Sequence, residues 1–307
     1  MKMEKCFKEF LDYLVSERDA SPYTIIGYKN DFKLFFEFLS NENIPMLADI
    51  ITTPDIRRYL AHIKSEKNYS VGSMRRKIHS LKSFYNFLLS QEYVNKSPMM
   101  PIKAPKDVDK VPVYLQPEEI ISLIQAPFRH GGENALRDKC IIETFVFSGI
   151  RRNELCFLDW DRICFKNYTI KVTGKGKKER VIPISEPLVS DLWAYLNSRL
   201  PLRERAVFTW PEGGRITSRT VNRMFSKYLK LAGLEGKGYS PHKLRHSYAT
   251  LLLQNGADLI AIKELLGHED LNSTKVYTKT DMTHLRAQTQ KFPLTMSLKN
   301  EGELPCN

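Results

Sequence analysis

Apolar residues recur at helical spacing in four stretches of the first 95 residues, with polar residues between them. In the first stretch, residues 4–17, this spacing places Phe7 and Phe10 on one helical face. The other three stretches begin at hydroxyl residues that favour a helix start, namely Ser21, Thr53 and about Ser70. Four amphipathic helices of this kind predict a small helical bundle.

A proline-rich segment separates this bundle from the rest of the chain. Residues 96–112, KSPMMPIKAPKDVDKVP, contain four prolines. Proline lacks a backbone donor and interrupts regular structure, so this segment is predicted to be an extended linker. We therefore expect a helical domain over residues 1–95, a second domain over residues 113–291 and a C-terminal tail over residues 292–307.

The second domain alternates helical patterns with a short run of strands. Helices are expected from the acidic start at residues 116–119, over residues 135–148 and again from Arg151. A small antiparallel sheet, with a basic glycine hairpin between its last two strands, is predicted for residues 162–165, 169–172 and 179–184. The remaining helices, the first two interpreted as scaffold, are expected over residues 186–200, 219–232, 241–255, 258–267 and 282–290. The predicted fold class is mainly α with a small antiparallel β-sheet.

The charge balance favours a polyanionic partner. The chain carries 47 Lys and Arg residues against 35 Asp and Glu residues, a formal net charge of +12. An excess of this size is typical of proteins that bind nucleic acid, although solubility alone also accounts for a modest excess. No apolar run reaches membrane-spanning length and the N-terminal residues lack a signal-peptide core, so we expect a cytoplasmic protein without a membrane partner.

The fourth predicted helix has a basic polar face near its start. Its candidates for DNA contact are Arg75, Arg76, Lys77 and Lys82. A solvated charged face is the ordinary interpretation of such a cluster. Because no acidic residue follows until Glu92, contacts to DNA phosphates are the alternative that we retain.

A second concentration of polar residues follows Ser240. His242 and Arg245 lie one turn apart at a predicted helix N-terminus, where backbone N–H groups already favour an anion. His268 then follows a helix-ending glycine, and Tyr277 follows shortly after. Each residue alone has an ordinary explanation as a cap, a surface residue or a packed aromatic. Their conjunction is a far more specific pattern.

The segments HKLRHSYAT, LLGHED and STKVYTK resemble the C-terminal boxes of the tyrosine recombinases, the phage-integrase and Xer-type family of DNA strand-exchange enzymes. FSGIRRNEL resembles the first box of the same family and places its catalytic arginine at Arg151 instead of Arg152. GKGKKER matches the hairpin pattern of the family and places its catalytic lysine at Lys175. Lys177 and Lys178, in the same hairpin, are further candidates for DNA contact.

The resemblance implies a four-helix core-binding domain followed by a catalytic domain. It also implies strand cleavage through a 3′-phosphotyrosine, four identical or paired protomers on two double-stranded DNA sites, and a Holliday-junction intermediate. The expected catalytic residues are Arg151, Lys175, His242, Arg245, His268 and Tyr277. A phosphotyrosine stores the energy of the broken bond, so no cofactor and no metal is expected. The sequence accordingly has no phosphate-binding G-x-x-x-x-G-K-[ST] loop and no convincing cluster of metal ligands.

Two other functions remain open at this point. A type IB topoisomerase uses similar residues to nick and relax a duplex, and recombination between two cognate sites distinguishes the two enzymes. A DNA-binding accessory protein with an inert site is the alternative from another class, although all six catalytic positions are filled. The resemblance implies integration, excision or resolution of DNA without selecting among them.

Overall fold

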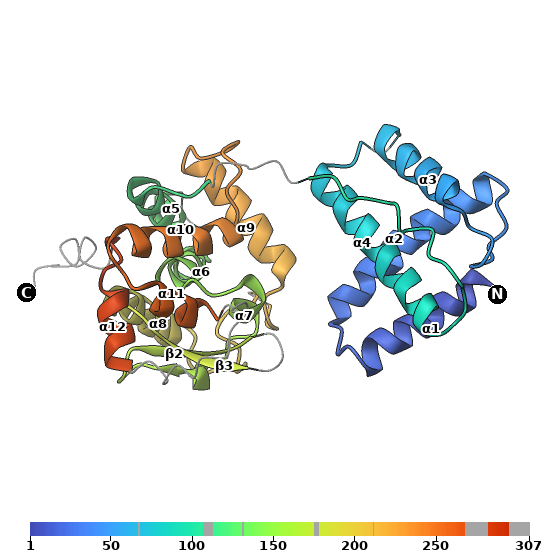
Figure 1. Cartoon of the computed structure of the whole chain (residues 1–307). Coiled ribbons are helices and arrows are strands. Elements are labelled where there is room, and N and C mark those ends of the chain that lie inside the picture. The colour runs from blue at the N-terminus through green and yellow to red at the C-terminus, as the bar shows by residue number, and fades with distance from the viewer. Residues whose placement is uncertain are drawn as a thin grey trace, which may run out of the picture. The chain divides into compact units, whose positions relative to one another are not determined.

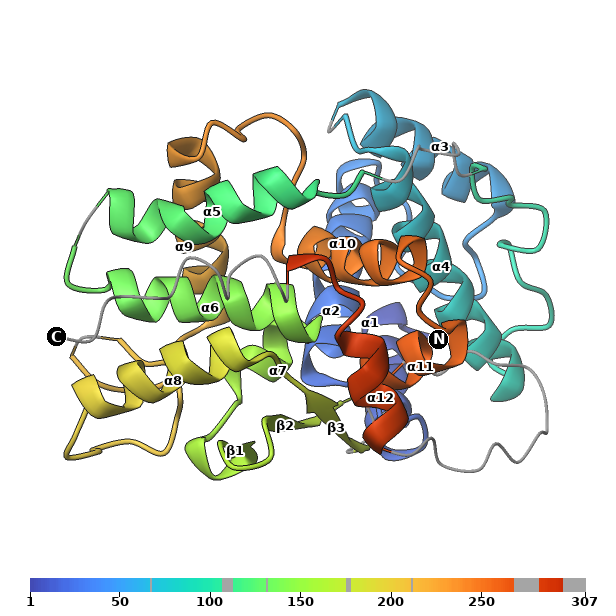
Figure 2. The same ribbon diagram turned by 90° about the vertical axis from the view of Figure 1, so that its left-hand side faces the viewer.

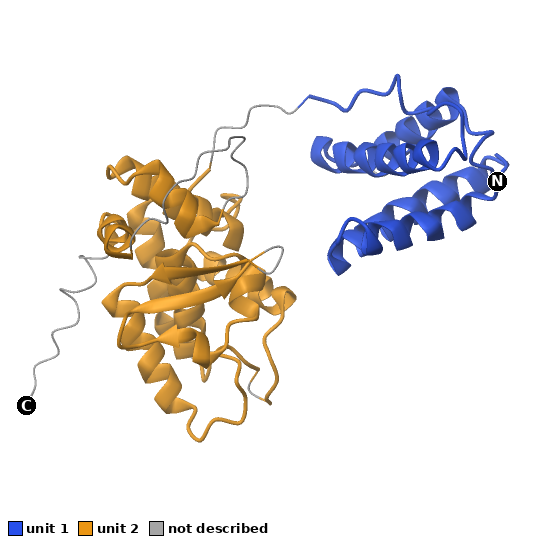
Figure 3. Cartoon of the chain, turned by 60° about the horizontal axis from the view of Figure 1, so that its bottom comes forward, with its two compact units in different colours: residues 1–110 blue, residues 111–307 orange. Residues whose placement is uncertain are grey.

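The chain divides into two compact units, Met1–Lys110 and Val111–Asn307 (Figures 1 and 3). The computed structural model describes residues 1–66, 68–106, 113–130, 132–174, 178–210, 212–267 and 282–294. Each unit has a hydrophobic core of its own. In the described parts of the chain, no helix has the length and apolarity that crossing a bilayer requires.

The described residues of the first unit form the four predicted helices. These are α1 (Met3–Ser16), α2 (Pro22–Asn41), α3 (Thr53–Ser65) and α4 (Val71–Ser90) (Figure 1). A hydroxyl accepts a hydrogen bond from the backbone N–H three residues on at the start of α2, α3 and α4, the caps being Ser21, Thr52 and Ser70. Such caps satisfy donors that the first helical turn leaves free.

Aromatic side chains join the helices of this bundle. The ring of Phe7 stacks on Phe32 with centroids 4.3 Å apart, and Phe84 meets Phe32 edge-on at 4.9 Å. Pairs of this geometry add about 0.5–1.5 kcal/mol beyond the area that they bury. Met99 and Ile102 are buried in the same core, so the first residues of the predicted linker pack onto the first unit.

The second unit is mainly helical with one small sheet. Its elements are α5 (Pro117–Arg129), α6 (Ala135–Ser148), α7 (Arg152–Cys156), a 3-10 turn (Trp160–Arg162), β1 (Ile163–Cys164), β2 (Thr169–Thr173), β3 (Glu179–Pro183), α8 (Glu186–Ser198), α9 (Ser218–Leu231), α10 (Pro241–Gln254), α11 (Leu259–Leu266) and α12 (Met282–Thr289). The strands are antiparallel in the order β1-β2-β3, and Ile170 pairs with Ile182. The predicted fold class is confirmed.

Helix α6 is the centre of this unit. It packs against α5, α8 and α10, which surround it in Figures 1 and 2. From Cys140 to Ser148 every side chain of α6 is buried, including those of Glu143 and Thr144. A helix that is packed on all sides is held in place relative to the elements around it. The end of α6 and the start of α7 therefore hold a defined position relative to α10.

Candidate active site

Arg151 lies between α6 and α7, directly after a turn at Gly149. Gly149 adopts φ 59° and ψ 21°, a left-handed conformation that suits glycine. Beyond the turn, the backbone N–H of Arg151 donates to Glu154 Oε2 at 2.6 Å. Its guanidinium Nη1 donates to Glu154 Oε1 at 2.9 Å. The buried carboxylate of Glu154 thus orients both the backbone and the side chain of Arg151.

Helix α10 carries His242 and Arg245 one turn apart, as predicted. The hydroxyl of Ser240 caps the helix. Arg245 is only 4% exposed, and its guanidinium is held by two backbone carbonyls. Nη1 donates to Gly149 O at 2.7 Å and Nη2 donates to Leu266 O at 2.5 Å. The end of α6, the start of α10 and the end of α11 are therefore joined through one side chain.

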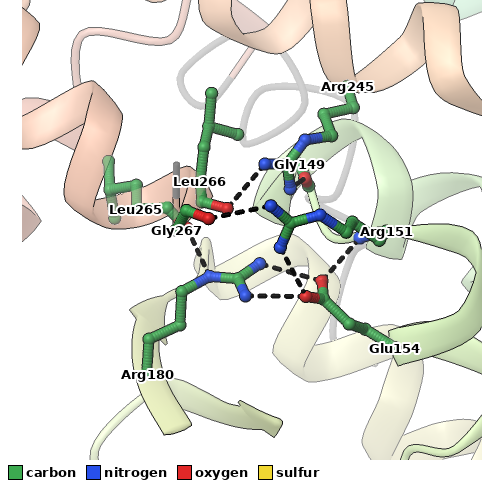
Figure 4. Close-up of polar contacts among 8 residues, drawn as sticks. All are labelled: Gly149, Arg151, Glu154, Arg180, Arg245, Leu265, Leu266 and Gly267. Atoms are coloured by element: carbon green, nitrogen blue, oxygen red, sulfur yellow. Dashed lines mark hydrogen bonds and ion pairs between the residues drawn. The ribbon is translucent and has the colours of Figure 1, made fainter. Parts of the chain in front are cut away.

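The carbonyls at the end of α11 each accept a hydrogen bond from a different arginine (Figure 4). The pairs are Arg180 Nε to Leu265 O at 2.8 Å, Arg245 Nη2 to Leu266 O at 2.5 Å and Arg151 Nη2 to Gly267 O at 2.8 Å. The last carbonyls of a helix lack partners within it and carry its negative dipole end, so cations are favoured there. The residue after Gly267 is the predicted catalytic His268.

Arg180 is a site residue that the sequence analysis did not identify. It lies on β3, and its Nη1 and Nη2 donate to Glu154 Oε1 and Oε2, both at 2.8 Å. Its side chain is 12% exposed. The available signal was strand alternation, which places Arg180 on the same face as the buried Ile182 and opposite to the exposed Val181. We call Arg151, Arg180, Arg245 and Glu154 the arginine cluster.

The arginine cluster contains three guanidiniums and one carboxylate, and the carboxylate pairs with Arg151 and Arg180 (Figure 4). Burial opposes the charge on Glu154, yet hydrogen bonds from Arg180 and then Arg151 hold the pKa of its carboxyl below the usual value. Burial, followed by repulsion from Arg151 and Arg180, lowers the pKa of Arg245 to about 10. The cluster therefore carries an excess of positive charge that an anion would stabilise.

A cavity of about 550 Å³ opens beside the cluster, lined by residues that include Arg151, His242 and Arg245. The structure thus brings these three predicted site residues to one place. His242 is exposed to solvent at the cavity. Partial desolvation by neighbouring protein atoms, followed by the charge of Arg245, lowers the pKa of its imidazole below the ordinary value. A histidine in this position is neutral near pH 7 and can accept a proton.

Four predicted site residues, Lys175, Lys177, His268 and Tyr277, lie outside the described residues. The structure describes the base of the hairpin, where the N–H of Gly174 donates to Lys178 O at 2.7 Å. Lys178 is exposed. A Cβ added to Gly174 would lie 3.6 Å from Glu154 Oε1, so the hairpin base contacts the arginine cluster.

Within the described residues, no group of three or more His, Cys, Asp or Glu side chains could hold a metal ion.

Helix α9, interpreted from sequence as scaffold, has an exposed cationic face. Its basic residues recur every three or four positions and are exposed: Arg219, Arg223, Lys227 and Lys230. Its sequence, SRTVNRMFSKYLKL, contains no acidic residue. Asn222 and Ser226, exposed on the same helix, line the cavity beside the arginine cluster. The spacing of these cations was visible in the sequence, but their position beside the cavity was not.

The basic face of α4 in the first unit differs from the prediction at one residue. Lys77 is only 2% exposed, and its Nζ donates to the buried Asp31 at 2.9 Å. Lys77 therefore forms an ion pair in the core and cannot contact DNA phosphates from the surface. Arg76 also pairs with Asp31, but about half of its side chain is exposed. Arg75 and Lys82 are partly exposed.

Comparison with known sequences agrees with this description. Residues 113–284 match the phage integrase family, and residues 7–92 match the N-terminal SAM-like domain of phage integrases. Tyrosine recombinase XerC of Halalkalibacterium halodurans is 36% identical over 286 residues, which cover 90% of this chain and 93% of the relative. Tyrosine recombinase XerC of Oceanobacillus iheyensis is 37% identical over 297 residues, with 93% and 94% covered.

Two solved structures share the fold. One is a lambda integrase dimer bound to a COC′ core site, 20% identical, with 90% of this chain and 100% of that chain covered and a TM-score of 0.69. The other is the XerH site-specific recombinase bound to difH substrate, 23% identical, with 93% and 87% covered and a TM-score of 0.67. On the sequence matches to both of its parts, the chain belongs to the phage integrase family.

Proposed function

We propose that this chain is a site-specific DNA recombinase that cleaves and rejoins DNA strands through a 3′-phosphotyrosine intermediate at Tyr277. The observation that carries the proposal is the arginine cluster, in which two guanidiniums pair with one carboxylate and the third, that of Arg245, has only backbone carbonyls as partners beside an open cavity. Buried positive charge in excess of its partners is costly unless an anion joins it. The phosphodiester of DNA is such an anion, and the names of the XerC relatives support this choice.

Arg151 and Arg245 are proposed to bind the non-bridging oxygens of the scissile phosphate. A guanidinium has five N–H donors, and its planar fork matches two oxygens of a phosphate. The bonds from Arg245 to the carbonyls of Gly149 and Leu266 use two of these donors and orient the group beside the cavity. Donors oriented in advance stabilise the charge of the transition state by about 3–4 kcal/mol each.

The proton transfers are assigned to His242 and Lys175. The hydroxyl of Tyr277 attacks phosphorus while His242 takes its proton, which the lowered pKa of His242 permits near neutral pH. The bond from phosphorus to the 5′-oxygen breaks as Lys175 gives that oxygen a proton. His268 donates a hydrogen bond to the phosphate. Religation runs these steps in reverse, with a DNA 5′-hydroxyl as the nucleophile.

Double-stranded DNA is the proposed partner, with four protomers on two paired sites. The exposed cations of α9 lie on the helix that lines the cavity, and Lys178 lies at the base of the hairpin. Both are well placed for phosphates that flank the cleaved bond. Arg75, Arg76 and Lys82 of α4 provide candidate contacts in the first unit.

The test is a covalent adduct on a suicide DNA substrate. Fragments that the protein binds at moderate salt are selected first and then nicked next to the candidate cleavage position. Wild-type protein should form an adduct that survives a denaturing gel, and Tyr277→Phe should bind the same DNA without forming one. Exchange between two such sites would distinguish recombination from simple relaxation. Tight binding without an adduct would contradict the proposal.

A further inference from the structure

Arg180 has no step in the proposed reaction, yet its side chain donates more hydrogen bonds than that of either other arginine in the cluster. Each of its three side-chain nitrogens has a partner, with Nη1 and Nη2 on the two oxygens of Glu154 and Nε on Leu265 O. The three distances are all 2.8 Å. A pairing of two nitrogens with two carboxylate oxygens is strong and directional. The role of Arg180 therefore concerns the geometry of its partners.

We propose that Arg180 is a positioning residue for strand cleavage. By occupying both oxygens of Glu154, it prevents Glu154 from forming a two-fold pair with the guanidinium of Arg151, and so keeps Arg151 available to the phosphate. This inference rests on the proposed function, because it assigns Arg151 to the phosphate.

The bonds of Glu154 support this division of roles. Oε1 accepts from Nη1 of both Arg180 and Arg151, whereas Oε2 accepts from Nη2 of Arg180 and from the backbone N–H of Arg151. The guanidinium of Arg151 thus has one contact with the carboxylate and sends its Nη2 to Gly267 O. Without Arg180, both oxygens of a buried carboxylate would be available to the remaining guanidinium, which would turn toward them.

Arg180 also joins three segments that carry proposed catalytic residues. Its own strand β3 continues from the hairpin, and a Cβ on Gly174 at the hairpin base would lie 3.7 Å from Arg151 Nη1. At the end of α11, a Cβ on Gly267 would lie 3.1 Å from Arg180 Cδ. The stem of Arg180 therefore packs against the glycine that ends α11. Loss of Arg180 would loosen the hairpin base and the end of α11 at the same time.

The primary test is Arg180→Met, which keeps an unbranched side chain and removes all donors. A misplacement of about 1 Å in a catalytic group costs about 100-fold in rate, so single-turnover cleavage should slow by about that factor. The affinity for DNA should change by less than about threefold, because Arg180 is not assigned a DNA contact.

Arg215→Met is the matched control. Arg215 also joins one carboxylate to backbone carbonyls, donating to Asp159 Oδ1 at 2.5 Å and to Cys156 O at 3.1 Å, but it lies outside the arginine cluster. Its loss should lower the stability of the fold by a comparable amount and leave cleavage by the folded protein unchanged. Equal loss of cleavage in both variants would show that Arg180 has only a structural role.

A second substitution separates positioning from general loosening. Glu154→Gln in the Arg180→Met background removes the charge that captures Arg151, so cleavage should recover by at least about fivefold over Arg180→Met alone. If Arg180 only supported the fold, the double variant would be as slow as Arg180→Met or slower. That result would overturn the proposal.

A spectroscopic measurement tests the pairing without catalysis. Burial raises the pKa of Glu154 while Arg180 supplies the largest opposing effect, so Arg180→Met should raise that pKa in a ¹³C NMR titration of the carboxyl, and Arg215→Met should not. An unchanged pKa would overturn the pairing. Wild-type protein without an adduct on bound DNA would overturn the proposed function, and with it any role in cleavage. Arg180→Met that cleaves as fast as wild type would overturn the role of Arg180 alone.

Discussion

Replacing Gly149 with alanine should destabilise the second unit through two separate effects. Gly149 has φ 59°, and a left-handed conformation costs an L-residue about 1–2 kcal/mol. The new Cβ would lie 2.6 Å from Tyr248 Cδ1 and 2.9 Å from Leu266 Cδ2, both in the core. Overpacking of a well-packed core costs about 1–3 kcal/mol. The free energy of unfolding should therefore fall by about 2–5 kcal/mol.

Gly256→Ala is the matched control. Gly256 has φ 76°, and a Cβ there would meet nothing within 4 Å. Only the conformational cost applies, so the free energy of unfolding should fall by about 1–2 kcal/mol. The difference between the two variants isolates the packing cost at Gly149.

The two variants should also differ in cleavage. The carbonyls of Gly149 and Leu266 both accept hydrogen bonds from Arg245, so a displacement of either would move a guanidinium assigned to the phosphate. Gly149→Ala protein that is fully folded should therefore cleave a suicide substrate at least about tenfold more slowly. Gly256→Ala should cleave at the wild-type rate.

Urea unfolding of the purified proteins measures the stability effect, with equal m-values required before the midpoints are compared. Each kcal/mol should lower the melting temperature by about 2–4 °C for a unit of this size. Equal unfolding free energies for Gly149→Ala and Gly256→Ala would refute the contact between Gly149 and its neighbours. Normal cleavage by Gly149→Ala would refute the coupling to Arg245.

The further predictions concern charge. Arg245→Lys keeps one charge but loses the fork, so single-turnover cleavage should fall by about 100-fold or more while a gel shift shows nearly normal DNA binding; normal cleavage would contradict its assignment. The pKa of His242 is lowered from 6.5, chiefly by desolvation, so the acid limb of the cleavage rate should lie below pH 6.5. Because the pKa of His242 is higher in the unfolded chain, the unfolded state binds the proton at a higher pH than the folded state. The free energy of unfolding should therefore fall as pH falls through 6.5, and the urea midpoint measured against pH tests this. Lys77→Met leaves Asp31 short of a buried partner and should lower the free energy of unfolding by about 3 kcal/mol in urea titrations. Lys82→Met should instead spare stability and reduce the salt slope of DNA binding by about one; the reverse pattern would contradict the burial of Lys77.

The sequence by itself determined the helices and the order of the elements, because the signals for both are local. A serine that caps a helix and a glycine that ends one act within a few residues. Ser240 caps the start of α10 in this way, and Gly149 ends α6. The compound motifs likewise identified the family without any knowledge of the fold. The roles of Lys175, His268 and Tyr277 stay predictions from those motifs.

Only the tertiary structure decided which charged residues are buried and what they pair with. The sequence made Lys77 a candidate for DNA contact on an exposed helix face, but Lys77 is buried and its partner Asp31 lies 46 positions away in the sequence. The sequence placed Arg180 only in a predicted strand. In the structure it pairs with Glu154, 26 positions away, and Arg151 pairs with Gly267, 116 positions away. A long charged side chain is stable in the interior only where a distant segment supplies its partner. Such pairing depends on the packing of whole elements, which periodicity along the chain does not encode.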